Sequence, residues 1–193
     1  RLYALSLQAQ RSGGAVHVLL GNHEQYILRG NISRANKEHL YALEQIGGHA
    51  KALAADTVLG QWLRAQPVVL QAGTVLFTHG GIAPQFAAAG LSVDSLNDAM
   101  RGYWRGQTAP SAALDAALGP AGVTQYRGYF EAAEDSYPKA SADDVRRVLR
   151  HFGATEMVVG HTLVERVTSL HGGLVHAVDV NTDTAAPEVL VFE

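Results

Sequence analysis

Hydrophobic and polar positions follow two different periods along this chain. Apolar residues spaced by three or four positions predict helices over about residues 1–10, 36–46, 50–65 and 142–152. Short apolar runs bounded by glycine or polar residues predict strands at 16–20, 68–70, 75–78, 157–159, 166–170, 174–180 and 189–192. The runs at 68–70 and 75–78 predict a hairpin, and the last three runs predict antiparallel structure. The pattern therefore indicates a mixed α and β class, with a central sheet or pair of sheets flanked by helices.

The chain has 193 residues without an internal repeat or linker, so we expect a single domain over residues 1–193. Its net charge of -3 gives no electrostatic reason to expect nucleic acid or an acidic membrane surface as a partner. No apolar run approaches the ~18 residues that would suggest a membrane span. Cysteine is absent, which excludes disulfides, thiolate nucleophiles and cysteine-based zinc sites.

Three predicted strands end in a similar way, with a glycine at or near the turn and a side chain able to bind a metal. These ends are GNHE (Asn22, His23), HGG (His79) and GHT (His161). Side chains at the tips of rigid strands are well placed to form a site, and the glycines let the backbone approach a ligand closely. Imidazole and amide groups suit manganese, iron or zinc, and three protein ligands leave room for water and substrate. A lone histidine after a strand is more often a packing residue, so the prediction rests on the ordered set.

Together with the segment Tyr126-Arg127-Gly128 and the tail VVGHT…GGLVHAVDVNT, these motifs resemble the calcineurin-like metallophosphoesterases. The resemblance is to their phosphoprotein phosphatase branch, and within it to the Shewanella-like bacterial protein phosphatases. It extends over essentially the whole chain. It implies a β-sandwich flanked by helices, and two divalent ions, with manganese favoured over iron or zinc. It also implies hydrolysis of phosphomonoesters, on phosphoproteins (Ser/Thr or Tyr) or small phosphoesters, by a metal-bridging water.

The resemblance also assigns roles to individual residues. Asn22, His79 and His161 are expected to bind the second metal ion, and His23 to protonate the leaving oxygen. Protonating a leaving group suits an imidazole, because histidine ordinarily titrates near neutral pH. Arg127 is expected to clamp the phosphate through paired N–H donors, with Arg105 as the alternative.

Two motifs of that family, GDxHG and GDxxDRG, do not occur in this chain. We therefore expect an N-terminally truncated domain that lacks its first two strands and retains at most one metal site. Such a segment is expected to be weakly active or inactive by itself. Glu24 is interpreted as supporting the GNHE loop, and Asp179 as structural.

Two alternative functions stay open at this point. One is a dinucleoside polyphosphate or cyclic nucleotide hydrolase of the same fold, because substrate choice would depend on residues 84–140. The other is a catalytically silent domain that binds a partner. The compartment, bacterial cytoplasm or periplasm, and the oligomeric state are left undetermined by the sequence.

Overall fold

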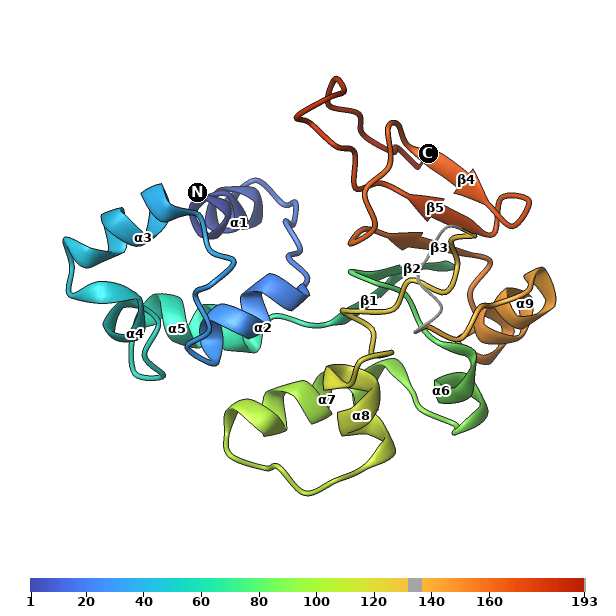
Figure 1. Cartoon of the computed structure of the whole chain (residues 1–193), viewed down its shortest axis with the longest axis horizontal. Coiled ribbons are helices and arrows are strands. Elements are labelled where there is room, and N and C mark those ends of the chain that lie inside the picture. Colours follow the sequence, from blue (N-terminus) through green and yellow to red (C-terminus); the bar gives the residue numbers. More distant parts are fainter. Residues whose placement is uncertain (132–136, 193) are drawn as a thin grey trace. The chain divides into compact units, whose positions relative to one another are not determined.

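The computed structural model describes residues 1–131 and 137–192. The chain divides into two compact units, Arg1–Pro67 and Val68–Glu193, and each is described by itself (Figure 1). The single domain expected from the sequence stays a prediction. In the described part of the chain, no helix is both long and apolar enough to cross a membrane.

Unit 1 is helical. Its helices are α1 (Leu2–Arg11), α2 (Asn22–Leu28), α3 (Lys37–Glu44), α4 (Gly48–Ala52) and α5 (Val58–Ala65). The helices predicted near residues 1–10 and 36–46 are confirmed. The single helix predicted over 50–65 is wrong, because the chain forms α4 and α5 instead. Thr57 caps α5 by accepting a hydrogen bond from the Gly60 amide on its hydroxyl, so a new helix begins there.

The strand predicted at 16–20 is also wrong. These residues are extended without forming a strand, and Leu20 is held by one backbone hydrogen bond from its amide to the Pro67 carbonyl, 2.9 Å. An apolar run becomes a strand only where a neighbouring strand pairs with its backbone groups. The GNHE segment that follows opens α2, where the Gly21 amide donates to the Glu24 carboxylate, 2.9 Å. Asn22 and His23 therefore lie in the first turn of a helix rather than in a loop.

Unit 2 is built on one mixed sheet. The strands are β1 (Val69–Ala72), β2 (Val75–Thr78), β3 (Glu156–Val159), β4 (Thr168–Leu170) and β5 (Val175–Ala177), in the spatial order β1-β2-β3-β5-β4. The central strands β2, β3 and β5 are parallel, and β1 and β4 pair antiparallel at the edges. The predicted hairpins at 68–78 and 166–180 are thus confirmed. The strand predicted at 189–192 is wrong, because Val189 lies in irregular backbone with 85% of its surface exposed.

The remaining helices of unit 2 are α6 (Pro84–Ala88), α7 (Val93–Trp104), α8 (Ala112–Leu118) and α9 (Ala142–His151). Alternate strand residues such as Leu76, Met157 and Val175 are fully buried, as expected for the packed face of a sheet. The predicted mixed α and β class is therefore observed, but the expected β-sandwich is not. Over the described residues the strands form one sheet flanked by helices rather than two packed sheets.

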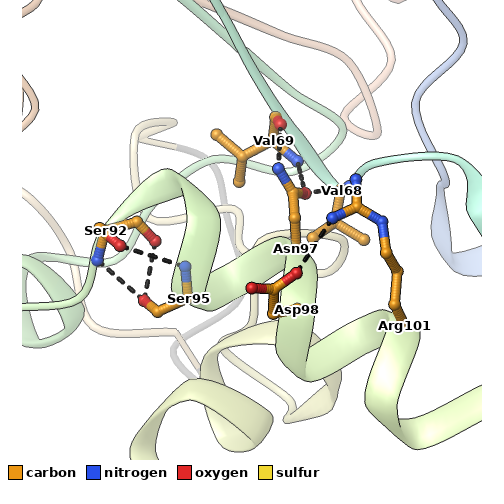
Figure 2. Close-up of polar contacts among 7 residues, drawn as sticks. All are labelled: Val68, Val69, Ser92, Ser95, Asn97, Asp98 and Arg101. Carbon is orange, nitrogen blue, oxygen red and sulfur yellow. Dashed lines mark hydrogen bonds and ion pairs between the residues drawn. The ribbon is translucent and has the colours of Figure 1, made fainter.

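Helix α7 is joined to the beginning of β1 by a buried asparagine (Figure 2). The amides of Val68 and Val69 both donate to Asn97 Oδ1, at 2.9 and 3.1 Å, and Asn97 Nδ2 donates to the Val69 carbonyl, 2.9 Å. At the start of the same helix, Ser92 and Ser95 cap each other's backbone amides. The bonds of Asn97 fix the first strand of the hairpin, and the second strand of the same hairpin leads to His79.

Candidate functional site

The carboxyl ends of the three parallel strands meet at one edge of the sheet in unit 2. Thr78 at the end of β2 is paired with Val159 at the end of β3, which is paired with Ala177 at the end of β5. The pairing continues past the strands, because the Gly160 amide donates to the His79 carbonyl, 2.9 Å. The carboxyl edge of parallel strands is where open α/β sheets usually bind ligands.

The histidines of HGG and GHT lie next to each other at this edge. The ring centroids of His79 and His161 are 5.0 Å apart, with an angle of 57° between the ring planes. His161 is buried and His79 is half-buried. Both were predicted to follow strands, and the parallel pairing of β2 and β3 explains why they meet.

Gly160 lies close to both His79 and Asp179 at this edge. A Cβ added to Gly160 would lie 3.8 Å from His79 Nδ1 and 3.8 Å from the Cβ of Asp179. The Cβ of Asp179 and Nδ1 of His79 therefore both lie close to Gly160. Asp179 follows β5 by two residues, and β5 is the third parallel strand of this edge. The interpretation of Asp179 as structural stays a prediction.

Arg127 is held against the turn that follows β3. Its Nη1 donates to the His161 carbonyl, 2.9 Å, and to the Thr162 hydroxyl, 3.0 Å. His161 has a φ of +64°, a left-handed conformation that is uncommon for residues with a side chain but is more frequent for asparagine, aspartate and histidine than for the others. This conformation turns the chain sharply beyond β3. Thr162, which sequence reasoning did not select, thus helps to position the arginine.

The glycines of HGG allow the segment that carries Arg127 to come close. A Cβ on Gly80 would lie only 2.7 Å from the Tyr126 backbone nitrogen, and the Gly80 amide donates to the Val123 carbonyl, 2.7 Å. Gly81 has a φ of +132°, which residues with a side chain rarely adopt. The HGG turn and the YRG segment are therefore packed backbone to backbone.

Two buried tyrosines stabilise this packing. The Tyr126 hydroxyl donates to the Pro138 carbonyl, 2.6 Å, and the Tyr129 hydroxyl donates to the Ile82 carbonyl, 2.5 Å. Burial raises the pKa of both phenols well above the ordinary value, because a charged phenolate is poorly solvated there. Both side chains stay neutral at physiological pH and act as hydrogen-bond donors that hold the segment in place.

The other two predicted site residues lie in unit 1. Asn22 is buried and His23 is exposed, because neighbouring residues on a helix point in different directions. His23 lies at the wall of a cavity of about 330 Å³ formed by α2, α3 and the loop between them. In unit 2, Arg105 ends α7 as an exposed residue, whereas Arg127 contacts His161. In unit 2, His79, His161 and Arg127 therefore lie together, whereas Asn22 and His23 belong to unit 1.

Neither a family model nor a curated protein matches the chain. Solved structures do match it. Two are described as a cold-active protein tyrosine phosphatase and a mutant of such an enzyme, each 33% identical with a TM-score of 0.80. A third, from a psychrophilic Shewanella species, is described in the same way and is 32% identical with a TM-score of 0.80. Each comparison covers 96% of this chain, but only 54%, 55% and 56% of the other protein, so the chain spans about half their length.

These findings correct the identification as a calcineurin-like metallophosphoesterase of the phosphoprotein phosphatase branch, and the manganese-favoured pair of ions expected with it. The similar structures are described as protein tyrosine phosphatases. Within residues 1–131 and 137–192, no three His, Cys, Asp or Glu side chains form a group that could hold a metal ion. The comparisons support the coarser statement, a likeness to phosphatases.

Proposed function

We propose that this chain is part of a protein phosphatase that hydrolyses phosphate monoesters on proteins, with phosphotyrosine as the favoured side chain. The observation that carries the proposal is the match of 96% of the chain, at 33% identity and a TM-score of 0.80, to cold-active protein tyrosine phosphatases. The polar cluster at the carboxyl edge of the sheet lies within the matched fold. Its histidines and arginine are side chains that phosphate chemistry commonly uses.

Arg127 is proposed to bind the phosphate group. A guanidinium presents several N–H donors in one plane and can hold two phosphate oxygens at once. Because Nη1 is directed by the His161 carbonyl and the Thr162 hydroxyl, the guanidinium is oriented before a ligand arrives. An oriented donor costs less entropy to use in the transition state than a mobile one.

The histidines are proposed to surround the reacting groups as polar donors and acceptors. His79 and His161 lie next to each other, and Arg127 contacts the His161 carbonyl, so a phosphate oxygen or an attacking water bound by Arg127 is proposed to meet them. The role of proton donor to the leaving oxygen that the sequence assigns to His23 stays a prediction, and an exposed imidazole is suited to it. The metal-ligand roles expected from the sequence for Asn22, His79 and His161 are not carried forward.

The test is a comparison of two phosphopeptides that share one sequence and differ only in phosphotyrosine or phosphoserine. Phosphate release is measured for the wild-type chain, Arg127→Ala and Arg105→Ala. Each protein is assayed once with a chelator and once with an added divalent ion, so that the comparison of rates does not depend on whether the buffer contains metal. We expect faster release from the phosphotyrosine peptide, a fall of about 10²-fold or more for Arg127→Ala, and little change for Arg105→Ala. Faster release from the phosphoserine peptide, or an unchanged rate in Arg127→Ala, would overturn the proposed function.

A further inference from the structure

Helices α6 and α9 of unit 2 pack against each other, and a cavity of about 410 Å³ lies between them (Figure 1). That volume is within the range of about 300–1,000 Å³ that is usual for small-ligand sites. Three small apolar residues of α6 and three basic residues of α9 line the cavity, namely Pro84, Ala87, Ala88, Arg147, Arg150 and His151. The residues of the cluster at the sheet edge are not among these lining residues, so the cavity is a separate feature of the unit.

The basic wall follows from helical spacing in α9. Arg147, Arg150 and His151 are three or four positions apart, so they lie on one side of the helix, and all three are exposed. The buried apolar residues of α9 occupy the other side. Because the net charge of the whole chain is -3, this concentration of basic side chains is a local property of the surface.

The three basic side chains differ in how far their donors are already used. Arg147 pairs with Asp144, and His151 Nε2 donates to the Leu91 carbonyl, 2.6 Å. Among the residues that the structure describes, Arg150 forms no hydrogen bond or ion pair. The described lining of the cavity contains no Asp or Glu. An anion in the cavity would therefore meet the Arg150 guanidinium without a carboxylate that competes for it.

The bond from His151 also fixes the two walls relative to each other. Leu91 follows α6 in the chain, and its amide donates back to the Phe86 carbonyl of that helix, 3.4 Å. His151 is the last residue of α9, and its ring contacts the Phe152 ring edge to face, with centroids 4.7 Å apart. The end of α9 is thus connected to the end of α6 before a ligand binds, and a site held in this way loses less entropy on binding.

The apolar wall is shallow and aliphatic. Pro84 and Ala87 are half-buried and Ala88 is exposed, and their short side chains leave the cavity open. An aliphatic group placed against them would be removed from water, which is favourable. A glutamate side chain combines such an aliphatic stem with a carboxylate, and arginine can bind a carboxylate through paired N–H donors. The two walls together therefore match an acidic side chain.

We propose that the cavity between α6 and α9 docks an acidic segment of a partner protein. A glutamate carboxylate of that segment is bound by Arg150, and its aliphatic stem lies against Ala87 and Ala88. The complementary charge of the basic wall and the small size of the α6 side chains carry the proposal. It does not depend on the proposed phosphatase activity, because the cavity and the cluster at the sheet edge have no residue in common.

Binding is tested by titrating the full chain with a short peptide of alternating glutamate and alanine, and in parallel with the same peptide carrying glutamine in place of glutamate. The NMR signals of the Ala87 and Ala88 methyl groups and of the His151 ring are followed. We expect saturable shifts with the glutamate peptide that weaken at high salt, and none with the glutamine peptide. Absence of saturable shifts at these residues, or equal shifts with both peptides, would overturn the proposal.

A pair of variants separates the cavity from the general charge of α9. Arg150→Gln is expected to weaken binding of the glutamate peptide about threefold to fivefold, the effect of losing one exposed ion pair. Arg146→Gln is the matched control, because Arg146 lies on the same helix with 51% of its side chain exposed, pairs with Asp143 at 2.7 Å and does not line the cavity. Unchanged affinity in Arg150→Gln, or an equal loss in both variants, would contradict the role of the cavity.

Two further measurements test the apolar wall and a free anion as the occupant. Ala88→Glu places a negative charge on the α6 wall at an exposed position, so we expect it to remove saturable binding of the glutamate peptide. Retained binding in this variant would show that the peptide does not enter the cavity. Inorganic phosphate is titrated under the same conditions. If phosphate shifts the same signals at lower concentration than the peptide does, the cavity is a site for a free oxyanion, and docking of an acidic segment is wrong.

Discussion

At the scale of single residues, the glycines near the sheet edge differ in how much space they have. A Cβ on Gly80 would lie 2.7 Å from the Tyr126 nitrogen and 2.9 Å from the Gln125 nitrogen, both backbone atoms that cannot move away alone. Gly80→Ala is therefore expected to lower the free energy of unfolding by about 1–3 kcal/mol. Urea denaturation followed by circular dichroism measures this change.

Gly160→Ala is the control for that variant. Its added Cβ would make only ordinary contacts of 3.5 Å or more, the nearest with the His79 carbonyl oxygen. We expect the urea midpoint of Gly160→Ala to stay close to that of the wild-type chain. Equal destabilisation of both variants would show that close packing of the HGG turn on the YRG segment is not what requires Gly80.

His161 is a second residue whose backbone conformation limits which residue types the position tolerates. Its φ of +64° is tolerated by asparagine but is unfavourable for a β-branched residue. Both His161→Asn and His161→Val remove the imidazole, so the difference between their free energies of unfolding reports mainly on the cost of the left-handed backbone conformation. We expect His161→Val to be less stable than His161→Asn by about 1 kcal/mol in the same urea experiment. Equal stabilities would contradict the left-handed conformation.

Single residues also show which members of the sheet edge could be predicted from the sequence and which could not. His79 and His161 were recognisable because each follows an apolar run and has a glycine beside it. Asp179 follows a run of the same kind, but no glycine turn marks its end, and only the parallel pairing of β3 with β5 reveals that it shares their edge. Strand order is a property of long-range pairing, which a local pattern does not contain.

At the scale of elements, α7 and β1 are connected through the Asn97 side chain (Figure 2). Replacing Asn97 by alanine leaves the buried Val68 and Val69 amides and the Val69 carbonyl without this partner. Each buried group left unpaired costs about 1–3 kcal/mol, so we expect Asn97→Ala to lose about 3 kcal/mol or more. Thermal and urea unfolding of the variant check this value.

The neighbouring position supplies the control for Asn97. Asp98 pairs with Arg101 at 3.2 Å on the solvent side of the same helix, where Asp98 is 71% exposed. Exposed pairs contribute little, so Asp98→Ala is expected to change stability by less than about 0.5 kcal/mol. A similar loss in both variants would mean that α7 itself is sensitive to substitution, independent of its bonds to β1.

Helix α9 begins with a capping box that depends on pH. The Ser141 hydroxyl and amide donate to the Asp144 carboxylate, at 2.6 and 2.9 Å, and Arg147 pairs with it. These contacts, the Ser141 hydroxyl first, hold the pKa of Asp144 below its ordinary 3.8. A lowered folded-state pKa stabilises the fold above pH 3.8, and the contribution is lost as the pH falls through the lowered value.

Asp144→Asn is therefore expected to be less stable than wild type near neutral pH, and the difference should shrink as the pH is lowered below 3.8. Urea midpoints measured across this range test it. Asp143→Asn removes the same formal charge from the same turn without removing a cap contact. A gap between Asp144→Asn and wild type that is independent of pH would contradict the ionic contribution of the cap.

Elements were predictable from sequence where one local signal was sufficient. The Ser141-to-Asp144 pattern and the spacing of Val145, Val148 and Leu149 correctly predicted α9, whose three apolar residues are buried. The runs at 16–20 and 189–192 had the same apolar character as the true strands, but they found no pairing partner among the described residues. In GNHE, a glycine occupies the N-cap of α2, so the usual serine or threonine signal of a capping box was missing.

At the scale of the whole molecule, buried apolar side chains are distributed unevenly between the two units. Among the described residues, the buried apolar core of unit 1 consists of Leu20 and Leu53, and the other members of the core belong to unit 2. Large apolar residues of unit 1 are instead exposed, namely Leu2, Leu5, Leu7, Tyr41, Ile46, Val58 and Leu59. A segment of this length that buries so little apolar surface gains little free energy against its conformational entropy.

The last prediction concerns the two units expressed as separate fragments. Residues 68–193 contain the whole sheet and its packed helices, and are expected to unfold cooperatively in urea with dispersed amide NMR signals. Residues 1–67 are expected to retain partial helicity without a cooperative transition, because their helices are short and bury few apolar side chains. A cooperative transition in the shorter fragment, or its absence in the longer one, would show that the buried core does not determine which unit folds by itself.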